Sequence, residues 1–169
     1  MKYLEYNLWI DTNSDEENTR LTAVKKWEEN ASLYVGEYLE TKKYLSKAFI
    51  KTYEDNFGYR GCFLSDLLLS SNSKNKSDTA WRNLPTCKIL LSDLIDMWQL
   101  TYYGLELLDY HPATGKKNSL ALTNGYMAVE FSELLIVDKD KFSHELLFSN
   151  GTSLLIHFTK ISAKKIHQP

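Results

Sequence analysis

Two Asn-Gly dipeptides in the C-terminal third constrain the fold of this chain more than any other feature. Asn124-Gly125 and Asn150-Gly151 are each flanked by alternating apolar residues, which is typical of β-hairpins with two-residue turns. Such a turn at Asn150-Gly151 would place His144 directly opposite His157. Both faces of that hairpin carry apolar residues, so we expect it near the centre of a sheet.

The other strands follow from the same kind of pattern. Around Asn124-Gly125, a two-residue turn would pair Leu122 with Met127 and Leu120 with Val129, which gives one wholly apolar face. Earlier apolar segments are also expected to be strands: residues 59–69, 87–91 and 97–108. No helical pattern separates these strands, so the sheet should be antiparallel.

The amino-terminal part has a helical pattern instead. Apolar residues recur at steps of three and four throughout residues 14–55, as they do on one stripe of a helix. Ser14 and Glu17 have the spacing of a capping box. One helix over the whole stretch would be several times the usual length, so we expect a break near residues 32–36. Gly58 is expected in the left-handed position that ends the second helix.

Together these elements predict an α+β protein. We expect an N-terminal helical hairpin over residues 14–55, packed on a mostly antiparallel β-sheet, a meander over residues 59–166. The pattern leaves open whether that sheet is strongly curved. The chain has 169 residues, of which 43% are hydrophobic, so residues 1–169 are expected to form a single domain with one core.

Charge and composition exclude several classes of function. The chain has 20 Lys and Arg against 22 Asp and Glu, a formal net charge of -2, which argues against nucleic acid as a partner. No apolar run resembles a secretory signal or approaches the roughly 18 residues that cross a bilayer. We therefore expect a cytoplasmic protein without membrane contact, in which Cys62 and Cys87 are buried, reduced thiols.

No motif in the chain carries a catalytic or cofactor signature. The glycines are scattered singly, so there is neither a phosphate loop nor a dinucleotide fingerprint, and we expect no catalytic residue, no cofactor and no metal site. The predicted His144–His157 pair is the sharpest candidate, with Asp138 as a nearby carboxylate. Two opposed imidazoles could share a metal ion or contact a partner, although most such strand residues simply hydrogen-bond to their neighbours.

Acidic residues are frequent along the first predicted helix. Glu28, Glu29, Glu37 and Glu40 give this half of the chain a local negative charge. Such a helix face is either merely solvated or forms an electrostatic docking surface for a basic partner. The candidates for partner contact are therefore Glu28, Glu29, Glu37, Glu40, His144 and His157.

Two segments of the chain resemble a known group of proteins. They are residues 49–58 (FIKTYEDNFG), which lead into the expected strand at 59–69, and residues 142–158 (FSHELLFSNGTSLLIHF). In these segments, and in the order of helices before strands, the chain resembles small bacterial immunity proteins of toxin systems, including those of contact-dependent growth inhibition. The resemblance implies a non-enzymatic protein that binds and blocks a cognate toxin domain, often a nuclease with a basic active surface.

The alternative is a small enzyme or ligand-binding domain with a pocket between the sheet and the helices. Its polar groups would be His144, His157 and Asp138. The sequence leaves both hypotheses open, together with the oligomeric state.

Overall fold

The computed structural model describes residues 1–70, 85–93, 95–112 and 127–166, so the predicted hairpin at Asn124-Gly125 lies outside the described residues. The helical elements are α1 (Tyr6–Asp11), α2 (Glu17–Thr41), α3 (Lys47–Asp55) and the short 3₁₀ helices η1 (Lys42–Tyr44) and η2 (Phe57–Tyr59). The strands are β1 (Phe63–Ser70), β2 (Thr86–Ser92), β3 (Met97–Tyr103), β4 (Leu107–His111), β5 (Val129–Asp138), β6 (Lys141–Phe148), β7 (Ser153–Phe158) and β8 (Lys160–Ile166).

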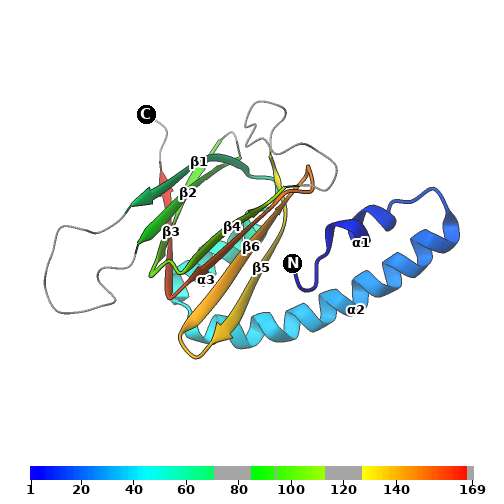
Figure 1. Cartoon of the computed structure of the whole chain (residues 1–169), viewed down its shortest axis with the longest axis horizontal. Helices are drawn as coiled ribbons and strands as arrows, with labels where there is room; N and C mark the ends of the chain where they lie inside the picture. The colour runs from blue at the N-terminus through cyan, green and yellow to red at the C-terminus, as the bar shows by residue number, and fades with distance from the viewer. Residues whose placement is uncertain (71–84, 94, 113–126, 167–169) are drawn as a thin grey trace, which may run out of the picture.

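The strands form two four-stranded sheets (Figure 1). Sheet A has the order β1-β2-β3-β8 and sheet B the order β4-β7-β6-β5, and each neighbouring pair is antiparallel. This confirms the α+β class and the central position of the β6–β7 hairpin. The strands are divided between two sheets where the sequence pattern predicted one, and neither sheet is closed or strongly curled.

The division between the sheets occurs at a corner formed by Gly104 and Thr159. The predicted strand over residues 97–108 is two strands, since β3 and β4 flank Gly104 and belong to different sheets, as do β7 and β8 on either side of Thr159. Gly104 has a φ of 64°, and a side chain there would overlap that of Thr159. Only glycine accepts both the left-handed conformation and this close approach, so the corner interrupts an otherwise continuous apolar pattern.

The long helix α2 continues through residues 32–36, so the predicted break there is wrong. The helix ends at Thr41, and α3 begins after Ser46, whose hydroxyl accepts a hydrogen bond from the Phe49 amide at 3.2 Å. A serine N-cap of this kind is a local start signal. Packing of α2 along β5 outweighs the weak helix preference of the residues around Gly36, because tertiary contacts supply most of the stability of a protein helix.

The chain before α2 contains a helix that the sequence pattern does not predict. Residues Tyr6–Asp11 form α1, which lies outside the expected helical region. The Ser14 hydroxyl accepts a hydrogen bond from the Glu16 amide at 3.2 Å, so the predicted capping box with Glu17 does not form. The reason is position, since Glu17 is the first residue of α2 and not the third residue after a cap.

The core lies between the two sheets and is covered by α3, which inserts Phe49 and Tyr53. Gly58, at a φ of 67°, turns the chain after α3 as the sequence predicts. Cys62 and Cys87 are buried and unbridged, also as predicted. Burial raises the pKa of both thiols to about 11, so neither is a reactive thiolate at neutral pH.

Candidate functional site

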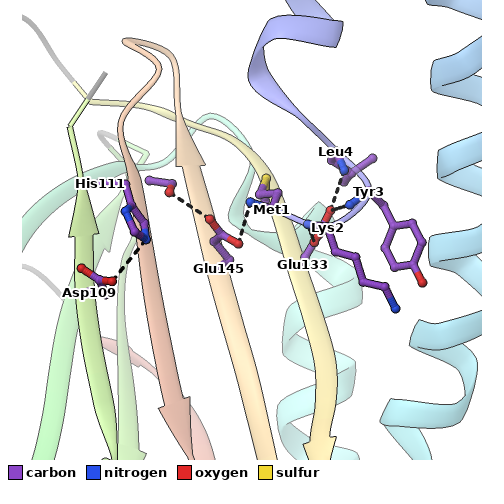
Figure 2. Close-up of polar contacts among 9 residues, drawn as sticks. Met1, Lys2, Tyr3, Leu4, Asp109, His111, Glu133 and Glu145 are labelled. Carbon is purple, nitrogen blue, oxygen red and sulfur yellow. Dashed lines mark hydrogen bonds and ion pairs between the residues drawn. The ribbon is translucent and has the colours of Figure 1, made fainter. Parts of the chain in front are cut away.

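One buried carboxylate holds the chain before α1 against sheet B (Figure 2). Glu133 of β5 is only 1% exposed and lies on the face of the sheet that turns away from the core. Its oxygens accept hydrogen bonds from three consecutive backbone amides, Lys2 at 2.9 Å, Tyr3 at 2.9 Å and Leu4 at 2.6 Å. Because hydrogen bonds to a charged acceptor are strong, this side chain fixes the path of the amino-terminal segment.

A second carboxylate, Glu145 of β6, lies directly opposite Glu133 in the sheet. Two like charges in opposed positions destabilise a strand pair unless other groups compensate them. The amino group of Met1 compensates Glu145 at 2.8 Å, and the Ser153 hydroxyl donates to it at 2.9 Å. Residues 1–4 therefore supply the positive and hydrogen-bonding groups that both carboxylates need (Figure 2).

The amino-terminal segment also connects sheet B to α2. The side-chain amide of Asn30 donates to the Tyr3 carbonyl at 3.0 Å, and the Tyr3 hydroxyl donates to Glu37 at 3.1 Å. Further along α2, the Tyr34 hydroxyl donates to the Ser132 carbonyl at 3.2 Å. One side of α2 is thus fixed to the sheet by polar contacts at several points.

The solvent-facing side of α2 carries an apolar stripe. Its members are spaced three and four residues apart or at multiples of a turn, so they share one side of the helix. They are Leu21 (59% exposed), Val24 (37%), Val35 (54%) and Leu39 (46%), with Glu28 between them. Glu28 has no ion-pair partner within the part of the chain that the structure describes. We call these five residues the α2 stripe. Single exposed apolar residues are ordinary, but an aligned set is a candidate interaction surface.

The four glutamates predicted to form one acidic docking surface do not share one side of α2. Successive helical residues are rotated by about 100°, so Glu28 belongs to the stripe while Glu29, Glu37 and Glu40 point elsewhere. Each of these three has a lysine partner within 4 Å: Glu29 with Lys26 at 3.8 Å, Glu37 with Lys2 at 3.5 Å and Glu40 with Lys43 at 2.6 Å. The charge of that side is largely balanced, and Glu28 remains the strongest acidic candidate for partner contact.

The predicted His144–His157 pair is wrong. His144 lies opposite Ile156 and His157 opposite Ser143, so the two imidazoles are on different faces of sheet B. The turn contains three residues, not two, because the Phe148 amide bonds to the Thr152 carbonyl at 2.8 Å and Gly151 adopts a φ of 81°. A change of one residue in register moves every side chain to the other face.

His144 is instead the centre of a buried hydrogen-bonded network. Its Nδ1 lies 2.7 Å from the Tyr102 hydroxyl and its Nε2 lies 2.7 Å from the Ser132 hydroxyl, which is 2.9 Å from the Tyr53 hydroxyl. Burial lowers the pKa of His144 to about 3, so the ring is neutral at physiological pH. Both ring nitrogens have partners, which leaves no lone pair free to bind a metal ion.

The outer histidine and Asp138 do not complete a site with His144. His157 lies on the outer face of sheet B, opposite Leu107 of β4, and Asp138 is exposed at the end of β5. A cavity of about 300 Å³ opens between β1 and β4, with walls formed by Leu64, Leu67, Leu108, Met127, Phe148 and Leu154, and with Asp66 and Tyr110 as its polar residues. It contains none of the three polar groups predicted for an enzyme or ligand site.

Comparisons with known proteins do not assign the chain to a family. Neither the protein-family models nor the curated proteins contain a match to the chain. None of the helices in the described ranges combines the length and apolar character needed to cross a membrane.

Sequence reasoning missed both the carboxylate pair and the stripe. Nothing in the sequence marks Glu133 or Glu145, since each is one polar residue in an alternating strand and its partners in residues 1–4 lie more than 100 positions away. The stripe did have a signal. The apolar residues of the helical region do not all lie on one side of the helix, because a rotation of about 100° per residue places Leu21, Val24, Val35 and Leu39 on a different side from Trp27 and Tyr34.

Proposed function

We propose that this protein is a non-enzymatic interaction protein that binds a protein partner through the α2 stripe. The observation that carries the proposal is the exposure of four aligned apolar side chains on a helix whose other side is anchored to sheet B. A surface held in place before binding loses little conformational entropy when a partner docks. An exposed apolar stripe on an anchored helix is therefore a suitable binding element.

Glu28 defines the chemistry of the partner. A carboxylate in the middle of an apolar contact is desolvated on binding, and it destabilises the complex unless a cation reaches it. We therefore expect a partner surface with an apolar patch and a central Lys or Arg. A cytoplasmic immunity protein that blocks a basic, nuclease-type toxin domain has this requirement, and the resemblance of residues 49–58 and 142–158 to such proteins supports the same form of the proposal.

The alternative of a small enzyme gains no support from the arrangement of its candidate residues. His144 is enclosed by Tyr102 and Ser132, and His157 lies on the opposite face of the sheet. The lining of the cavity between β1 and β4 includes none of His144, His157 and Asp138, so these predicted residues supply it with no acid, base or nucleophile. A ligand-binding role for this mostly apolar cavity is open to direct test.

The proposal is tested by binding measurements with the product of the neighbouring gene as the partner. We expect Leu21→Asp to weaken binding by more than tenfold, because it places a charge in the apolar contact. Leu33→Asp is the matched control, since Leu33 is also 59% exposed but lies on another side of α2. Glu28→Lys should likewise weaken binding while Glu29→Lys does not. Equal effects of both members of each pair, or no binding by the wild type, would contradict the proposal.

A further inference from the structure

The α2 stripe is self-complementary when the helix is turned end to end. If two copies of α2 lie antiparallel and cross near Asn30, Leu21 of one copy faces Leu39 of the other. In the same register Val24 faces Val35 to within one residue, or about 1.5 Å along the axis. We infer that in the free protein a second copy of this chain covers the stripe, with the two α2 helices antiparallel. An interface of this kind is isologous, the usual form in homodimers.

Glu28 of the stripe and the neighbouring exposed Ser32 fit the same register. Glu28 of one copy faces Ser32 of the other, so a carboxylate that accepts hydrogen bonds meets a hydroxyl that donates one, twice around the two-fold axis. Both residues are exposed, and neither has a side-chain partner in the described ranges. A polar contact at the centre of an apolar helix pair fixes its register and orientation.

The ends of the stripe are complementary in charge. Glu17, in the first turn of α2, faces Lys43 of the second copy, which lies beyond the last turn and also pairs with Glu40 of its own chain. A parallel arrangement would instead bring Glu17 against Glu17 and Lys43 against Lys43. Opposite charges in the antiparallel pair and like charges in the parallel pair both favour the antiparallel form.

Gly36 is a second, independent observation. Glycine weakens a helix interior, yet a side chain at Gly36 would meet no atom within 4 Å. The contacts of the single chain therefore do not explain a glycine at this position. In the antiparallel register Gly36 lies at the level of Val24 of the second copy and about 60° around the axis from Leu39, so the missing side chain lets the second helix approach closely at this edge of the stripe.

The size of the contact sets its strength. A helix of 25 residues is about 37 Å long and about 11 Å wide, so α2 offers roughly 400 Å² per copy. Stable complexes bury about 800 Å² per partner, so we expect a weak, concentration-dependent dimer. The inference rests on the proposed function in one respect, that the α2 stripe is a binding surface, and a tighter partner would displace the second copy.

Variants with one added surface cysteine test the arrangement directly. Leu21→Cys and Leu39→Cys are prepared separately, mixed at high protein concentration and oxidised mildly. The antiparallel register brings residues 21 and 39 of different copies together, within reach of a disulfide, while two residues 21 lie about 27 Å apart. We expect a covalent dimer in the mixture and little in either variant alone. The native thiols, Cys62 and Cys87, are buried and do not interfere.

The outcomes separate this inference from the proposed function. Cross-linking of each variant with itself would overturn the antiparallel register, and a sedimentation profile that stays monomeric at every concentration would overturn the dimer. Leu39→Asp should abolish self-association, while Leu33→Asp should leave it intact. A monomer that still binds its partner through the stripe refutes only the dimer, whereas a dimer that binds no partner refutes only the proposed function.

Discussion

The two faces of sheet B bury polar side chains in opposite ways. On the inner face, His144 is neutral, and its partners are the uncharged hydroxyls of Tyr102 and Ser132. On the outer face, Glu133 and Glu145 are carboxylates whose partners are the Ser153 hydroxyl and the backbone amides and amino group of residues 1–4. The inner network is complete within the core, whereas the outer one requires a distant segment to be in place.

This difference explains how α2 is positioned. The outer carboxylates cannot be buried without the amino-terminal segment, since an uncompensated buried charge is strongly destabilising. The segment in turn bonds to Asn30 and Glu37 of α2. The requirement of the carboxylates for partners therefore also holds the helix in a fixed orientation, with its apolar stripe toward solvent.

The largest expected effect comes from removing the outer network. Glu133→Ala leaves three amides without their acceptor, and we expect the free energy of unfolding to fall by about 3 kcal/mol. Hydrogen exchange in α2 should accelerate as well, because the helix loses its attachment through residues 2–4. Denaturant unfolding measures the first effect. Glu130→Ala, in the same strand but with only a 4.0 Å contact to Arg60, should change stability by less than about 1 kcal/mol.

An effect that is intermediate for each pH unit should appear in the pH dependence of the inner network. The pKa of His144 is about 3 in the folded protein against an ordinary value of 6.5, so between these values the unfolded chain binds more protons. Stability conferred by the neutral ring is complete above pH 6.5 and is lost as the pH falls toward 3, by up to about 1.4 kcal/mol per pH unit. We measure this as the difference between wild type and His144→Gln, which does not titrate. Parallel stability curves for the two proteins would contradict a buried neutral His144.

The smallest effect should come from a single link between the outer network and α2. Asn30→Ala removes one hydrogen bond to the Tyr3 carbonyl, and we expect a loss of about 1 kcal/mol. The change should lower the unfolding midpoint without altering the pH dependence attributed to His144. If Asn30→Ala were as damaging as Glu133→Ala, the carboxylate would not be the principal anchor of this region.

Local sequence patterns predicted the helices and strands better than the contacts that these elements make with one another. The alternation around Asn150-Gly151 correctly placed a central antiparallel hairpin, because each strand must bury apolar side chains at every second position. The same dipeptide is compatible with turns of two and of three residues, and that one-residue difference decided whether His144 faced His157 or the core. The candidate pair failed for this reason, although both histidines lie in the strands predicted for them.

The sequence by itself determined that this protein has helices first and antiparallel strands afterwards, since those features depend on periodicity and turn residues within short windows. It also marked Gly58 as a turn and Cys62 and Cys87 as buried thiols. Only the tertiary structure decided that the strands divide at Gly104 into two sheets, that Glu133 holds the amino-terminal segment, and that one side of α2 remains exposed. These outcomes depend on groups far apart in the chain, whose mutual compensation of charge and hydrogen bonds has no local signature.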